Sequence, residues 1–153
     1  MDKQQVLKNL DRAWEALKDS YAGVPDDELV KAGVMEGWSI KDIIAHITWW
    51  EEEALKHLPT ILEGGKPPRY SVAYGGIDAF NALMTEQKKN LPLSEVLRQR
   101  DDIHLRLIEF IRDAPEDEFN RETRFLHRLR LDTYSHYLKH AEAIRSWRER
   151  RLL

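Results

Sequence analysis

The chain has 153 residues, contains no cysteine and carries a formal net charge of −3 at pH 7. The lack of cysteine excludes a disulfide scaffold, a thiolate nucleophile and any metal site with cysteine ligands. The acidic balance offers no general positive field to nucleic acid or anionic lipid. We therefore expect no nucleic-acid partner, and the length suggests a single domain over residues 1–153.

The first residues, MDKQQVLKNLDRAWEAL, carry acidic and basic side chains throughout and lack the apolar core of a signal peptide. No apolar run approaches the roughly 20 residues that a membrane-spanning helix needs. These features predict a cytoplasmic protein without a membrane partner.

The first helix is predicted from an apolar stripe with the spacing of one helix face. The stripe comprises Val6, Leu10, Trp14 and Leu17. Gly23 and Pro25 follow it and should end this helix.

A second helix is expected to start at Ser39, because Ser39 and Asp42 form the Ser-x-x-Asp variant of a capping box. Its buried stripe is expected to comprise Ile40, Ile43, Ile44, Ile47, Trp50 and Ala54. Pro59 should kink or end the helix. If it does not, Gly64 and Gly65 should end it.

Residues 64–76 are polar and rich in glycine and proline, which predicts a long crossover connection. A short helix is expected over residues 77–90, and a longer one over residues 91–115, with Ser94 as a plausible N-cap.

The last third of the chain begins with the charged stretch 116–131, which predicts a loop with one helical turn. Asp132 is expected to cap a final helix whose apolar stripe comprises Tyr137, Ala141, Ile144 and Trp147. Since no alternating strand pattern stands out, the fold class is predicted to be all-α, a four-helix bundle with the crossover between its second and third helices.

Histidines form the most informative polar pattern. His136 and His140 are four residues apart, which places both imidazoles on one helix face, where two nitrogens can reach one divalent ion. His46 lies on the apolar face of the second helix, either as a third ligand or as a core residue. Three imidazoles leave open coordination positions, as in catalytic zinc sites, and nickel or iron would also accept them. By contrast, His57 and His104 are expected to be exposed.

The stretch GWSIKDIIAHITWWEE resembles the signature Trp-Ser-x-x-(Asp/Glu)-x-x-x-His that opens the second helix of the DinB superfamily. In that family the signature histidine and a His-x-x-x-His pair on the last helix hold a metal, and here these positions are His46, His136 and His140. Two further segments, residues 75–111 and the tail HYLKHAEAIRSWRERR, resemble more narrowly the ClbS/DfsB-type branch of this superfamily.

The resemblance implies a DinB-type four-helix bundle, often a homodimer, that binds zinc, nickel or another divalent metal. It implies an enzyme that acts on a small electrophilic molecule, as a metal-dependent hydrolase or as a thiol S-transferase that uses a low-molecular-weight thiol. The alternative is a non-catalytic small-molecule binding or resistance protein of the ClbS/DfsB type.

Four further residues are candidates for catalytic or pocket roles. Glu53 lies seven residues after His46 and could orient a histidine or act as a base, although its place in a run of glutamates favours a solvated charge. Trp49 is the better candidate to line a pocket, whereas Trp50 on the apolar stripe is expected in the core. Tyr70 and Tyr74 in the crossover could cover the site as a lid.

Overall fold

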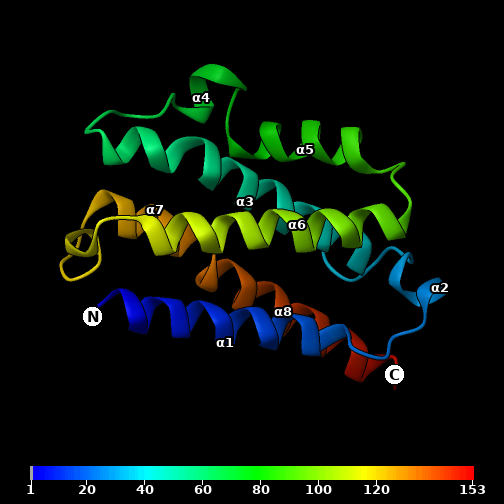
Figure 1. Cartoon of the computed structure of the whole chain (residues 1–153). Coiled ribbons are helices and arrows are strands. Elements are labelled where there is room, and N and C mark those ends of the chain that lie inside the picture. The colour runs from blue at the N-terminus through cyan, green and yellow to red at the C-terminus, as the bar shows by residue number, and fades with distance from the viewer. Residues whose placement is uncertain (1) are drawn as a thin grey trace.

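The structure is a computed structural model that describes residues 2–153 (Figure 1). Its elements in chain order are α1 (Lys3–Tyr21), α2 (Asp26–Leu29), α3 (Ile40–Leu62), α4 (Tyr70–Ala73), α5 (Ile77–Lys88), α6 (Leu93–Asp113), η1 (Glu116–Glu118), α7 (Arg124–Asp132) and α8 (Tyr134–Arg150). In these residues the only β pairing is an isolated bridge between Met35 and Trp38. The expected all-α class is therefore confirmed.

The long helices α1, α3, α6 and α8 make the body of the fold. Helix α1 packs along α8, and α3 packs along α6 and contacts α5, α7 and α8 as well (Figure 1). The apolar stripes predicted for α1, α3 and α8 are buried in full. Because α3 contacts the most neighbours, its side chains reach both the core and the outer pockets. No helix in residues 2–153 combines the length and hydropathy required to cross a bilayer.

Helix α3 begins and ends as its local chemistry dictates. The Ser39 hydroxyl accepts a hydrogen bond from the Asp42 N–H, and the Asp42 carboxylate accepts one from the Ser39 N–H, so the predicted capping box is present. Pro59 does not end the helix, which continues to Leu62 before Gly64 adopts a positive φ of 84°. The buried residues around Pro59 keep this turn packed, and packing outweighs the hydrogen bond that a proline removes.

Three predictions for the second half of the chain are wrong: Ser94 as the cap of α6, a loop over residues 116–131, and Asp132 as the cap of α8. Helix α6 starts at Leu93 after Pro92, whose fixed φ suits a helix entrance, so Ser94 is not its cap. The stretch predicted as a loop contains α7, which Thr123 caps by accepting a hydrogen bond from the Leu126 N–H. This helix buries Phe125, Leu126 and Leu129, a stripe too short to stand out among its charged neighbours.

Asp132 ends α7 instead of capping α8. The Arg128 Nε–H donates to Asp132 Oδ2 over 2.7 Å, and Thr133, with φ −123° and ψ −106°, separates the two helices. The crossover between α3 and α5 contains the single turn α4, whose Tyr70 packs against Trp50 and binds Glu53 of α3 (Figure 1).

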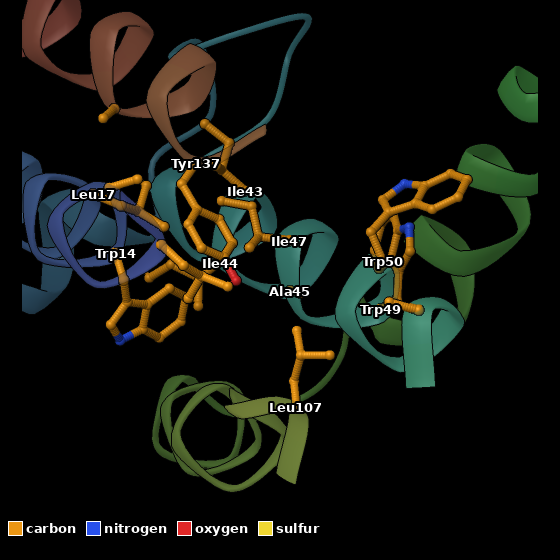
Figure 2. Close-up of a cluster of buried hydrophobic side chains, with 14 of the residues drawn as sticks. Trp14, Leu17, Ile43, Ile44, Ala45, Ile47, Trp49, Trp50, Leu107 and Tyr137 are labelled. Carbon is orange, nitrogen blue, oxygen red and sulfur yellow. The ribbon is translucent and has the colours of Figure 1, made fainter. Parts of the chain in front are cut away.

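Figure 2 shows part of the hydrophobic core, in which Trp14 of α1 and Tyr137 of α8 lie beside Ile44 and Ile47 of α3. A buried polar cluster next to this core joins all four long helices. Glu51 of α3 is fully buried and accepts hydrogen bonds from the Tyr137 hydroxyl of α8 and from His104 Nδ1 of α6, the latter at 2.7 Å. The indole of Trp14 in α1 stacks on the His104 ring with 3.6 Å between centroids. The prediction that His104 is exposed is therefore wrong, because the buried carboxylate needs hydrogen-bonding partners.

Replacing Glu51 with alanine is expected to lower the free energy of unfolding by about 3–5 kcal/mol, since it leaves two buried polar partners without their acceptor. Urea denaturation followed by circular dichroism measures the change. Glu52→Ala at the adjacent, partly exposed position is the matched control, expected to change stability by less than about 1 kcal/mol. Equal losses in the two variants would contradict a special role for Glu51.

Candidate metal centre and its pocket

Three histidines meet between α3 and α8. His136 Nε2 lies 2.9 Å from His46 Nε2 and 3.0 Å from His140 Nε2. One ring nitrogen of each residue lies within 4.8 Å of those of the other two. Within residues 2–153, the His triad (His46, His136 and His140) is the one group of three or more histidine or carboxylate side chains that could hold a metal ion.

Local structure explains this convergence. His136 and His140 lie one turn apart on α8, as their spacing predicts, and face α3 where the two helices pack. The His46 ring is held between Trp38, at 4.6 Å between centroids, and Trp49, at 5.0 Å. The indoles thus orient the His46 ring and shield it from water.

Burial keeps the three imidazoles neutral. Loss of solvent lowers the pKa of His46 to about 2, that of His136 to about 3 and that of His140 to about 4. Neutral imidazoles carry free lone pairs, which is the form that binds a divalent cation.

The residues present fit such an ion. Three Nε2 atoms facing one another cannot all be satisfied by hydrogen bonds among themselves, whereas one cation can accept all three lone pairs. The three Nδ1 atoms are buried and have no hydrogen-bond partner within residues 2–153. All-nitrogen ligand sets suit zinc and nickel.

A cavity of about 400 Å³ opens beside the His triad. Its walls come from α3, α4, α5, α7 and α8, and they comprise His46, Trp50, Tyr70, Ile77, Asn81, Arg128, Leu131, Asp132, His136 and Lys139. We call it the triad pocket. Its volume is in the usual range for small-molecule sites.

One side of the triad pocket is a chain of hydrogen bonds. The Tyr70 hydroxyl donates to Glu53 Oε1 over 2.8 Å and accepts from an Nη2–H of Arg128 over 3.0 Å. His57 Nε2 lies 3.4 Å from Glu53 Oε1, and Arg128 also binds Asp132. Burial raises the pKa of Asp132 to about 6. The pocket therefore contains a carboxyl group that exchanges its proton near neutral pH.

Of the candidates Glu53, Tyr70 and Tyr74, the structure places only Tyr70 in the wall of the triad pocket. Glu53 is buried behind Tyr70, so the interpretation as a solvated charge is wrong. Tyr70 lines the triad pocket, whereas Tyr74 packs against Tyr70 and Phe80 without lining it. These contacts say where the side chains lie and leave their catalytic roles as proposals.

Trp50 lies in the buried core, as expected, and also lines the triad pocket, whereas Trp49, the expected pocket residue, does not. Trp49 is 2% exposed and packs against His46, while Trp50 lines the triad pocket. Both indole N–H groups donate to Asn81 Oδ1, over 3.2 Å and 2.9 Å. The cause is α5, which covers this face of α3 and turns the stripe residue Trp50 into a pocket wall. The prediction for His57 is also wrong, since that residue is buried beside Glu53.

Sequence reasoning missed Asn81, Arg128 and Lys139 as pocket residues and read Asp132 only as a cap. The spacing of four between Arg128 and Asp132 was the one available signal, but it fell in a stretch predicted as a loop.

Comparison with known proteins gives a family and a set of similar folds. A sequence model of the DinB superfamily matches residues 9–142. The crystal structure of the colibactin self-resistance protein ClbS in complex with double-stranded DNA is similar at a TM-score of 0.78 and 13% identity, covering 95% of this chain and 94% of that one. The sibling lethal factor precursor DfsB gives a TM-score of 0.81 and 14% identity, covering 99% and 97%.

An uncharacterised protein from Escherichia coli UTI89 is similar to the same degree, with a TM-score of 0.81, 14% identity, and 99% and 95% of the two chains covered. No curated protein sequence matches the chain. At these identities the structural likeness shows the fold alone.

The complex with double-stranded DNA corrects one expectation. We expected no nucleic-acid partner from the net charge, and this exclusion is wrong, because a protein of the same fold has been crystallised with DNA. Net charge describes the whole surface and says little about one face of it.

The family match spans most of the sequence, including all three histidines of the His triad. The chain therefore belongs to the DinB superfamily.

Proposed function

We propose that this protein binds a small reactive molecule in the triad pocket, as a resistance protein of the ClbS/DfsB type. We further propose that His46, His136 and His140 hold a divalent ion, zinc or nickel, at the edge of that pocket. The observation that carries both proposals is a group of three neutral imidazoles, two of which, His46 and His136, line a cavity of about 400 Å³. The fold shared with a colibactin self-resistance protein supports the choice of ligand.

The residues of the chain divide the work of binding. A divalent ion on three imidazoles supplies Lewis acidity and an open coordination position. Trp50 and Tyr70 offer aromatic surface to the body of the ligand, and Asn81 holds the Trp50 indole in place. The Asp132 carboxyl can hold or release a proton close to neutral pH.

A protection assay tests this proposal. Plasmid DNA is treated with an electrophilic cyclopropane that alkylates DNA, with and without the protein, and strand damage is measured on gels. We expect protection to rise with protein until it matches the electrophile mole for mole. A parallel gel shift without electrophile measures binding of the protein to the duplex. Protection that follows coating of the DNA, or no protection at all, would contradict a small-molecule binding role.

A second candidate function is a metal-dependent hydrolase or thiol S-transferase. Asp132 favours it, because a buried carboxyl with a pKa of about 6 beside the His triad is placed for general acid–base work. As the chain has no cysteine, any thiol has to come from a low-molecular-weight cofactor. Chromatography of the electrophile separates the two functions: many product molecules per protein identify an enzyme, and at most one identifies a binder.

A further inference from the structure

The charges around the triad pocket are unbalanced. Arg128 and Lys139 are its two cationic residues and Asp132 is its one carboxylate. Since Arg128 is bonded to Asp132, their charges largely offset each other. Lys139 forms no ion pair within residues 2–153. Glu53, behind Tyr70, is a second carboxylate near the pocket and is engaged by the Tyr70 hydroxyl and His57. Lys139 is therefore the charged lining residue that keeps an unpaired charge at the pocket.

Lys139 acts on the same space as the His triad. Its side chain lines the same pocket as His46 and His136, and on α8 it directly precedes His140. The neutral imidazoles add no negative charge that could offset the lysine. A divalent ion on them would make the pocket more positive.

Arg128 brings a second set of donors to the pocket. Its Nε–H and one Nη group are bonded to Asp132 and Tyr70, and its remaining N–H groups have no partner within residues 2–153. A guanidinium held at two points presents these donors at fixed positions, which suits recognition of a carboxylate or phosphate oxygen. The contact with Tyr70 also places the guanidinium 5.8 Å from the centre of that ring.

The pocket wall next to Arg128 is flat and aromatic. The rings of Trp50 and Tyr70 lie 5.3 Å apart between centroids, and each is anchored by a hydrogen bond, the indole to Asn81 and the phenol to Glu53. Ile77 and Leu131, both more than half exposed, extend this surface at the pocket wall. Apolar surface next to fixed cationic donors suits a ligand with the same two parts.

We propose that the triad pocket selects small molecules with one anionic group and a flat apolar body. The anionic group binds Lys139 and the free N–H groups of Arg128 beside the His triad, and the body lies against Trp50 and Tyr70. This inference rests on the proposed function, because it names the class of molecule that the same pocket takes.

Three probes of the same shape test the charge preference: 2-naphthoate, the neutral 2-naphthamide and the cationic 2-naphthylmethylammonium. Calorimetry measures their binding to the metal-free protein, to the zinc-loaded protein and to variants. In the metal-free protein we expect 2-naphthoate to bind about tenfold more tightly than 2-naphthamide, as for a charge-assisted hydrogen bond. Binding of 2-naphthylmethylammonium should be weaker than that of either.

Variants identify the source of the preference. Lys139→Met should reduce the preference for 2-naphthoate over 2-naphthamide to about twofold or less. Because the Lys139 side chain is exposed, this variant should fold like the wild type. Lys8→Met removes an exposed lysine of α1 that does not line the pocket, and it should leave the preference unchanged. Trp50→Leu should weaken 2-naphthoate and 2-naphthamide alike, because both share the same apolar body.

The zinc titration separates the two proposals. If the protein binds zinc but binds 2-naphthoate and 2-naphthamide with equal affinity, the inference is overturned and the metal site stands. A preference for 2-naphthoate that depends on Lys139, without zinc binding, would support the inference and overturn the metal site. Absence of binding by all three probes, or tighter binding of the cation, would overturn the inference.

Discussion

Alanine at His46, His136 or His140 is expected to lower zinc affinity by more than about 100-fold in each case. Each substitution removes one of three converging nitrogens and leaves two, which compete poorly with water for the ion. Even the loss of an outer partner that only orients a ligand costs about 10–100-fold in affinity, so loss of a ligand itself should cost more. Isothermal titration of zinc and of nickel into each purified variant measures the effect.

The other histidines provide graded controls. His127 is exposed and lies outside the His triad, so His127→Ala should bind zinc like the wild type and be equally stable. His104→Ala should keep zinc affinity within a few-fold but lose stability, because His104 is bonded to the buried Glu51. Wild-type affinity in any triad variant would show that the metal site is misassigned.

The zinc affinity should change less than about twofold between pH 7.5 and pH 5 and then fall steeply below about pH 4. An ordinary histidine has a pKa near ~6.5, so three such ligands would lose about 10⁴-fold in affinity by pH 5. Burial lowers the pKa of His140 to about 4 and those of the other two further. Protons therefore compete with the metal only near and below pH 4, which corrects what the histidine pattern alone would predict.

Stability of the metal-free protein sets the range of this measurement. In the unfolded chain the three histidines bind protons below about pH 6.5, and in the folded protein they do not. The free energy of unfolding should thus fall as pH drops from about 6.5 towards 4, and Asp132, with its pKa raised to about 6, acts in the opposite sense. Circular dichroism at each pH identifies the samples that remain folded. A drop in affinity between pH 6 and 5 in folded protein would contradict the buried, neutral His triad.

The sequence determined the features that depend on neighbours a few residues apart. Helix periodicity alone located the buried faces of α1, α3 and α8, because an apolar stripe repeats at the pitch of the helix that it stabilises. The capping box of Ser39 and Asp42 is equally local and is present in the structure. The His136/His140 pair required only the helix pitch, and the resemblance to a family signature brought His46 into the same group.

Tertiary structure alone decided which side chains share a space. Helix α7 escaped detection because its apolar stripe is short, and with it went the pocket roles of Arg128 and Asp132. Trp49 and Trp50 are adjacent on one helix, so the packing of α5 on α3, and not their own sequence, determined which of them faces the pocket.

The buried glutamates of α3 show most clearly what local sequence leaves open and tertiary structure decides. In the run Glu51 to Glu53 the sequence singled out only Glu53, by its spacing from His46, yet Glu51 is fully buried against His104 and Tyr137. Glu53 in turn binds Tyr70. Each carboxylate is tolerated because a partner from a distant helix supplies its hydrogen bonds, and such partners are named only by the fold. Local pattern thus specifies where a helix runs and which face it buries, whereas the free energy of a buried polar group depends on residues that only the folded chain brings within reach.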